Sequence, residues 1–195
     1  MNKICCLDVE TLGVSSESVM LSVAITFIEL GKSQYYFQEL VDNSFYVKFN
    51  VKEQIENYKR TTEKDCINWW KKQTEPAKEF SFYPSSNDLS AETGIKLFTK
   101  YIKEQCDPNS IIVFTRGNLD SMVLDSLTKQ VKQPLIFPYS SYRDVRTYIE
   151  YCSEKSVKGY CDVNLELFPD YHKDKIWKHI PTLDCILDLM MIISC

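Results

Sequence analysis

Residues 3–13 of the chain, KICCLDVETLG, combine an apolar run with two acidic side chains near its end. The run from Ile4 to Leu7 has no polar alternation, which is typical of a strand buried on both faces, and the closing Thr-Leu-Gly indicates a turn. Asp8 and Glu10 are two positions apart, so on a strand both point to the same side. The stretch therefore predicts a buried strand that brings two carboxylates to one face at its end.

Two neighbouring carboxylates suit a hard divalent cation such as magnesium or manganese. These ions prefer oxygen ligands and complete their coordination with waters and substrate phosphates, which is the chemistry of phosphodiester cleavage. A buried strand also leaves Asp8 and Glu10 near the edge of the core, where their charge needs a partner. Asp-x-Glu alone is common by chance, and a solvated strand end is the alternative interpretation.

Outward from this strand, the sequence predicts an antiparallel meander. Apolar and β-branched residues fill 19–29, and aromatic residues begin 34–41 after a turn at Gly31, so we expect the second and third strands there. Farther on, 111–114 is another continuous apolar run and predicts a fourth strand. The spacing of apolar residues predicts helices within 62–78, 90–102, 119–131, 146–153 and 181–193.

Three strands followed by alternating helices and strands predict an α/β fold, a mixed sheet with helices on its faces. The 195 residues fit a single domain over 1–195, and the sequence contains no internal repeat or low-complexity tract. No apolar run reaches about 18 residues, and the first residues lack the apolar middle region of a signal peptide. We therefore expect a soluble, cytoplasmic protein without a membrane partner.

The net charge of −4 argues against a protein that coats long stretches of nucleic acid. It does not exclude an enzyme that grips only a strand end, because bound cations return positive charge where phosphate must sit. Eight cysteines without a signal peptide favour reduced thiols over disulfides. A zinc site built from Cys152, Cys161 and His172 is disfavoured, because their spacing contains no close ligand pair.

Residues 7–13 resemble the first motif of the DEDDh 3′–5′ exonuclease family, Asp-x-Glu-Thr-x-Gly. At the other end of the chain, His179 and Asp184 have the His-x4-Asp spacing of the family's third motif, and the predicted helix 181–193 follows as it does there. Further segments resemble phage members of the family, namely residues 67–73, 116–117 and 143–147. The resemblance extends along nearly the whole chain.

This resemblance implies a ribonuclease-H-like fold and four metal-binding carboxylates, those of Asp8, Glu10, Asp120 and Asp184. The family's second motif lies at a helix start after a middle strand, and Asp120 falls in that place. The usual motif has an asparagine four residues before the aspartate, whereas Asn118 is two before it here. The departure leaves Asp125 as the alternative ligand and a plain helix cap as the alternative role of Asp120.

His179 is the predicted general base. A neutral imidazole beside a metal can take the proton of the attacking water, because its pKa lies near neutral pH. The alternative is an ordinary surface histidine, which is how we interpret His172, the second of the two histidines. By the same resemblance, Thr11 and Leu12 occupy the place that contacts the terminal nucleotide.

These residues predict a metal-dependent 3′–5′ exonuclease that holds two Mg²⁺ or Mn²⁺ ions and releases 5′-mononucleotides from the 3′ end of single-stranded DNA or RNA. Trp69 or Trp70, but not both, is a candidate for stacking on a terminal base, since neighbours on a helix diverge by about 100°. DNA against RNA, processivity and oligomeric state stay open. The alternatives are a catalytically idle binding or regulatory protein on the same fold and an endonuclease. The phage resemblance suggests the cytoplasm of an infected bacterium.

Overall fold

The computed structural model describes residues 3–153, 159–160, 163–171 and 178–195. Within these residues, a five-stranded mixed sheet has the strand order β3-β2-β1-β4-β5. The strands are β1 (Lys3–Thr11), β2 (Met20–Glu29), β3 (Ser44–Lys48), β4 (Ile112–Thr115) and β5 (Tyr142–Asp144). The first three pair antiparallel, whereas β4 and β5 add in parallel beyond β1. The predicted mixed sheet, a meander followed by parallel strands, is confirmed.

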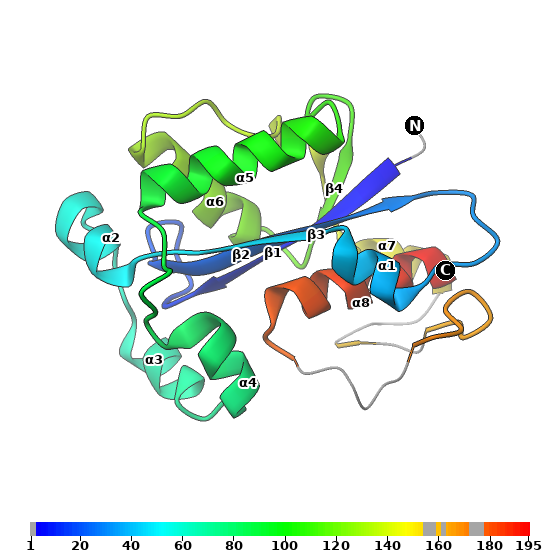
Figure 1. The fold of residues 1–195 in the computed structure, drawn as a ribbon, viewed down its shortest axis with the longest axis horizontal. Coiled ribbons are helices and arrows are strands. Elements are labelled where there is room, and N and C mark those ends of the chain that lie inside the picture. The colour runs from blue at the N-terminus through cyan, green and yellow to red at the C-terminus, as the bar shows by residue number, and fades with distance from the viewer. Residues whose placement is uncertain (1–2, 154–158, 161–162, 172–177) are drawn as a thin grey trace.

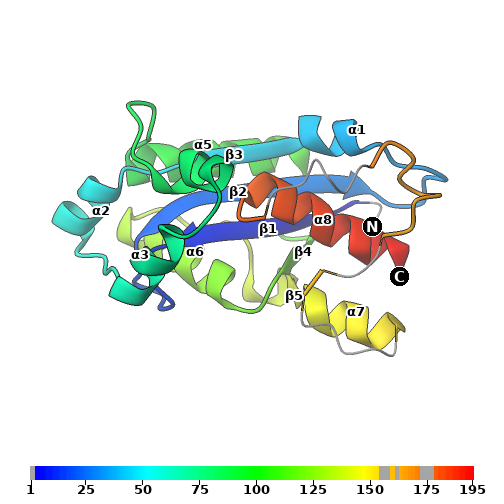
Figure 2. The same cartoon turned by 90° about the horizontal axis from the view of Figure 1, so that it is seen from below.

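Helices cover both faces of this sheet (Figure 1). The α-helices of the described residues are α1 (Phe37–Asp42), α2 (Val51–Tyr58), α3 (Lys64–Trp70), α4 (Glu75–Ala77), α5 (Ala91–Gln105), α6 (Leu119–Gln130), α7 (Val145–Ser153) and α8 (Pro181–Ser194). α5 and α6 pack on one face, and α1, α7 and α8 pack on the other, so the sheet separates two apolar clusters. α2 and α3 lie beyond the end of the sheet at which β1 finishes (Figure 2).

The alternation of side chains along β1 decides where its carboxylates point. The odd-numbered residues of 5–9 belong to the apolar cluster beneath α5 and α6, whereas Ile4 and Cys6 belong to the cluster beneath α8. Successive side chains on a strand point to opposite faces, so Asp8 and Glu10 continue the second series. The strand therefore directs both carboxylates toward the layer that contains α8.

The segment 34–41 was predicted as the third strand, and this prediction is wrong. The structure has helix α1 there, and β3 begins only at Ser44. The carboxylate of Asp170 accepts hydrogen bonds from the backbone N–H groups of Phe37 (2.7 Å) and Gln38 (3.3 Å). The first N–H groups of a helix need such acceptors. A local pattern of aromatic residues cannot reveal an acceptor more than 130 residues away.

Other predicted elements are confirmed with small shifts of their ends. α5, α6, α7 and α8 fall on the predicted helices, and β4 falls on the predicted fourth strand. The helix predicted within 62–78 is shorter and ends at Trp70, while α2 and β5 had no prediction. Among the described residues, no helix is long and apolar enough to cross a membrane.

Gly94 lies in α5 where this helix packs against residues 47–49. A Cβ atom at this position would come within 2.4 Å of Phe49 Cε1 and 2.9 Å of Val47 Cγ1. Alanine has a higher helix propensity than glycine. Gly94→Ala should nevertheless lower the free energy of unfolding by about 1–3 kcal/mol, because the buried Phe49 ring must shift. Urea denaturation measures this loss, with the exposed Lys100→Ala as the control on the same helix. An unchanged value for Gly94→Ala would contradict the packing described here.

Asp144 joins the ends of β4, β5 and α7. Its carboxylate accepts hydrogen bonds from the backbone N–H groups of Gly117 (2.6 Å) and Thr147 (2.7 Å) and from the Thr147 hydroxyl (2.8 Å). Partial burial raises the pKa of Asp144, but these donors outweigh burial and leave the pKa below its usual value. The ionised carboxylate therefore stabilises the fold above the unfolded pKa of about 3.9, and this stability is lost as pH falls through the lower folded pKa.

Asp144→Ala should lower the free energy of unfolding by about 1 kcal/mol at pH 7, in the range of a lost helix cap. The difference between wild type and variant should shrink as the pH drops below about 4, because protonation removes the same charge from the wild type. Urea denaturation of both proteins at several pH values measures it. A difference that does not change with pH would mean that the charge of Asp144 contributes nothing.

Candidate active site

Asp8 and Glu10 lie near the end of β1 on the side that faces α8. The Asp8 Oδ2 atom is buried and has no hydrogen-bond partner among the described residues. One carboxylate oxygen of Glu10, one of Asp184 and one ring nitrogen of His179 lie within 4.8 Å of one another. The structure therefore brings residues from the two ends of the chain together at one point.

Asp184 lies in the first turn of α8, which begins at Pro181. Its Oδ2 atom accepts a hydrogen bond from the His179 backbone N–H at 2.8 Å, and its Oδ1 atom accepts one from the Tyr160 hydroxyl. Each carboxylate oxygen has two lone pairs, so both oxygens retain one for another partner. The carboxylate is thereby fixed in direction and can still bind a cation.

Asp120 lies in the first turn of α6 and is almost completely buried. β4 pairs with β1 only as far as Cys6, so the Val9 backbone N–H lies beyond the last strand partner on that side. The Asp120 Oδ1 atom accepts a hydrogen bond from this N–H at 3.2 Å. Because Val9 stands between Asp8 and Glu10 in the sequence, the Asp120 carboxylate lies beside the part of β1 that carries both acids. Asp125, the alternative, instead interacts with Tyr142 and Lys129. The structure therefore brings Asp120, and not Asp125, to the carboxylates of β1.

The pKa values of these four carboxyl groups are all raised. Burial is the largest cause for each, and repulsion from neighbouring carboxylates also raises the pKa values of Asp8 and Glu10. The pKa of Asp120 is raised to about 7. Such a cluster can ionise fully only beside added positive charge. The unpartnered oxygen of Asp8 and the all-oxygen carboxylate set fit a hard divalent cation.

His179 lies in the segment just before α8 and is half-buried. Its backbone has a φ of 64°, in the left-handed region that few residues other than glycine adopt. Its ring makes a T-shaped contact with the Trp69 ring at a centroid distance of 4.6 Å and an interplanar angle of 80°. Burial lowers the pKa of His179, although Asp184 opposes this shift. The imidazole is therefore neutral near pH 7 and able to accept a proton.

The model of the 3′–5′ exoribonuclease Rv2179c-like domain family matches residues 3–185, and this range includes each of these carboxylates and His179. The chain belongs to this family. The resemblance to DEDDh exonucleases that the sequence motifs indicated is confirmed. A relative, the exodeoxyribonuclease of Enterobacteria phage T4, is 30% identical over 130 residues, which are 65% of this chain and 56% of that protein. The alignment thus spans little more than half the length of that relative.

Solved structures of nucleases share the fold of this Rv2179c-like domain. The nuclease domain of 3′hExo, a DEDDh family member bound to rAMP, has a TM-score of 0.57 at 11% identity and covers 98% of this chain and 90% of that one. Cell-death related nuclease 4 (CRN-4) has a TM-score of 0.52 at 13% identity, and the match covers 100% of this chain and 63% of that one. The zinc-bound complex of E. coli exonuclease I with single-stranded DNA has a TM-score of 0.56 at 9% identity, and the match covers 97% of this chain and 39% of that one. The predicted ribonuclease-H-like fold is confirmed by these likenesses.

In this Rv2179c-like domain, the residues after Glu10 form a closely packed turn. The Thr11 hydroxyl donates to the Gly13 carbonyl at 2.6 Å, and Leu12 is buried in an apolar cluster with Trp70. A Cβ atom at Gly13 would come within 2.5 Å of the Ser18 hydroxyl oxygen, so a larger residue at this position of the first motif would displace the side chains that pack on this turn. The contact of Thr11 and Leu12 with a terminal nucleotide stays a prediction.

The tryptophan pair divides between the core and the surface. Trp70 is completely buried and donates a hydrogen bond from its indole N–H to the Thr11 carbonyl at 2.9 Å. Trp69 is 40% exposed and contacts His179. Of the two, only Trp69 is therefore accessible to a substrate, in agreement with the divergence of neighbouring positions on a helix.

Two residues beside the site, Asp188 and Tyr160, were not singled out from the sequence, and Arg116 was noted only within a segment that resembles phage members of the family. Asp188 lies one helical turn after Asp184, Arg116 forms an ion pair with it, and Tyr160 donates to Asp184. Asp188 had one visible signal, because an acidic residue four positions after Asp184 in an apolar helix lies on the same face. Tyr160 had none, since nothing local relates it to α8.

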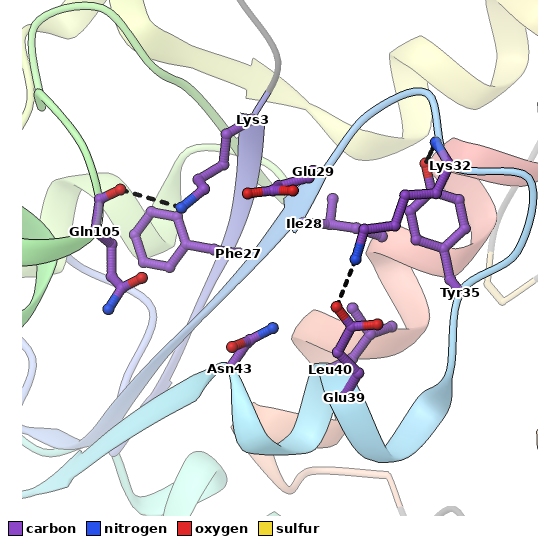
Figure 3. Close-up of a pocket in the computed structure, with 10 residues that line it drawn as sticks. All are labelled: Lys3, Phe27, Ile28, Glu29, Lys32, Tyr35, Glu39, Leu40, Asn43 and Gln105. Atoms are coloured by element: carbon purple, nitrogen blue, oxygen red, sulfur yellow. Dashed lines mark hydrogen bonds and ion pairs between the residues drawn. The ribbon is translucent and has the colours of Figure 1, made fainter.

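A further pocket among the described residues lies apart from the carboxylates. It has a volume of about 270 Å³, lies at the opposite end of β1 and is lined by Lys3, Lys32 and Glu39 among others, and Lys32 forms an ion pair with Glu39 there (Figure 3). Of the disfavoured zinc ligands, Cys152 is exposed, whereas Cys161 and His172 lie outside the described residues.

Proposed function

We propose that this chain is a metal-dependent 3′–5′ exonuclease that hydrolyses phosphodiester bonds at the 3′ end of single-stranded DNA or RNA and releases 5′-mononucleotides. The observation that carries the proposal is the meeting of Glu10, Asp184 and His179 within 4.8 Å, beside the buried carboxylates of Asp8 and Asp120. Carboxylates of this number, with raised pKa values, suit two Mg²⁺ or Mn²⁺ ions.

Asp8, Glu10, Asp120 and Asp184 would hold the cations. When bound, two such ions lower the pKa of a water nucleophile and stabilise the attacking and leaving oxygens of an in-line displacement. His179 accepts the proton of the water at a ring nitrogen, which its lowered pKa leaves free at neutral pH. The Asp184 carboxylate holds the backbone N–H of His179 and so fixes the segment that carries this base.

Two observations support the proposed substrate class, the exposure of Trp69 and the descriptions of the family and of its phage relative. The exposed part of Trp69 is an aromatic surface on which we propose that a terminal base stacks, and such stacking contributes about 1–3 kcal/mol. We propose that Thr11 and Leu12 lie next to the same nucleotide. The family is described as an exoribonuclease, the phage T4 relative as an exodeoxyribonuclease, so both sugars belong in the test.

The experiment compares end-labelled single-stranded DNA and RNA of matched sequence, incubated with Mg²⁺ or with EDTA. We expect 5′-mononucleotides from at least one substrate with Mg²⁺ and none with EDTA. A 3′-blocked oligonucleotide and a circular single strand should resist, because an exonuclease needs a free 3′ end. Cleavage of the circular strand would instead reveal an endonuclease, and binding without cleavage would favour an idle binding protein on the same fold.

A further inference from the structure

An ion pair between Arg116 and the buried Asp188 lies one helical turn after Asp184 along α8. The side chain of Asp188 is 4% exposed, and the Arg116 Nε atom donates to both of its carboxylate oxygens at 2.8 and 2.9 Å. A terminal nitrogen of the same guanidinium lies 2.6 Å from Asp188 Oδ1. Arg116 belongs to the turn between β4 and α6, so the pair ties this turn to the middle of α8.

The ion pair continues toward Asp184 through Tyr160. The Arg116 guanidinium carbon lies 4.3 Å from the centre of the Tyr160 ring, a cation–π contact, and the Tyr160 hydroxyl donates to Asp184 Oδ1. A chain of contacts therefore runs from Asp188 through Arg116 and Tyr160 to a carboxylate of the candidate active site.

We propose that Arg116 and Asp188 are positioning residues that act through Tyr160 to orient the Asp184 carboxylate for cation binding. The proposal rests on the proposed function in assigning Asp184 to a cation. Groups that hydrogen-bond to a metal ligand fix its direction, and losing one typically costs about 10–100-fold in metal affinity or activity. Arg116 suits this task because a planar guanidinium can bind a carboxylate through two bonds and stack on an aromatic ring at once, which a lysine ammonium cannot.

A purely structural role explains this arrangement less well. A buried ion pair contributes little net stability, because the cost of desolvating two charges offsets their attraction. Apolar side chains would fill the space between the β4–α6 turn and α8 at least as stably. They would not supply a cation over the Tyr160 ring or a hydroxyl directed at Asp184.

The test measures Mn²⁺ binding by calorimetry in the absence of nucleic acid, so its readout does not depend on catalysis. Tyr160→Phe removes a single oxygen and keeps the ring, and Arg116→Lys keeps the charge but loses the planar stack. Each should weaken the apparent Mn²⁺ affinity by about 10–100-fold. Tyr139→Phe, at a position that is 92% exposed, is the matched control and should bind Mn²⁺ as the wild type does.

The double variant tests whether Arg116 acts through Tyr160. If it does, Tyr160→Phe with Arg116→Lys should bind Mn²⁺ no more weakly than Tyr160→Phe alone, whereas independent effects would add. The proposal is overturned by wild-type affinity in Tyr160→Phe, or by additive losses in the double variant. A wild-type chain that binds Mn²⁺ but releases no nucleotide would reject the exonuclease proposal and leave this one intact.

Discussion

Asp8→Asn should lower the rate of magnesium-dependent mononucleotide release by about 1000-fold or more. Metal ions contribute several kcal/mol of transition-state stabilisation, and each factor of ten in rate corresponds to about 1.4 kcal/mol. Asp8 offers a buried oxygen with no protein partner among the described residues, and Asp8→Asn removes the negative charge of this proposed cation ligand. Release of labelled mononucleotides under single-turnover conditions measures the rate.

The same variant should not lose stability in EDTA. Burial and repulsion from Glu10, Asp120 and Asp184 disfavour the charge of Asp8, and a neutral amide relieves that repulsion. We therefore expect an unchanged or higher melting temperature for Asp8→Asn in EDTA, and a larger gain from added Mg²⁺ in the wild type. Asp42→Asn, at an exposed position that ends α1, is the control for changing an aspartate. Near-normal activity in Asp8→Asn would reject the assignment of Asp8.

His179→Ala should lower kcat by about 100- to 1000-fold, within the usual range for a lost general base. The half-buried imidazole has a lowered pKa and lies within 4.8 Å of Glu10 and Asp184, so it is neutral and close to the carboxylates. The Trp69 ring packs against the imidazole, and the Asp184 carboxylate accepts the backbone N–H of His179 and so fixes the segment that carries it. The KM for a single-stranded oligonucleotide should change much less than kcat, because proton transfer belongs to the chemical step.

The spacing of His179 also permits a different role, that of a metal ligand beside Glu10 and Asp184. Calorimetry with Mn²⁺ separates the two roles. A general base predicts a lower kcat with Mn²⁺ affinity close to wild type, whereas a ligand predicts that both fall. His172→Ala changes the other histidine and should leave kcat unchanged.

The strand that carries Asp8 and Glu10 and the helix that carries Asp184 were both predictable from the sequence. Each depends on a local pattern, an apolar run ending in acidic residues and an apolar helix after a histidine, and local patterns survive folding when one face must be buried. The family resemblance also predicted that Asp120 lies at the start of a helix after a middle strand. That Asp120 rather than Asp125 lies beside β1 depends on the Val9 backbone N–H, which is free to bind Asp120 because β4 pairs with β1 only as far as Cys6.

Contacts between distant segments were beyond the reach of the sequence. Arg116 and Asp188 are 72 residues apart, and no pattern marks them as partners. The helix at 37–42 likewise forms where aromatic residues favour a strand, because the Asp170 carboxylate satisfies its first N–H groups. In both cases the deciding interaction joins elements whose relative position exists only after folding.

The alternation of side chains along β1 also limits which changes in length the strand tolerates. Removing one residue between Lys3 and Leu7 would put the two parts of the strand out of phase, so that either the residues before the deletion or Asp8 and Glu10 would point to the wrong face of the sheet. Removing two would restore the phase and leave both acids where they are. Within β1, we therefore expect deletion of two residues to preserve the site better than deletion of one.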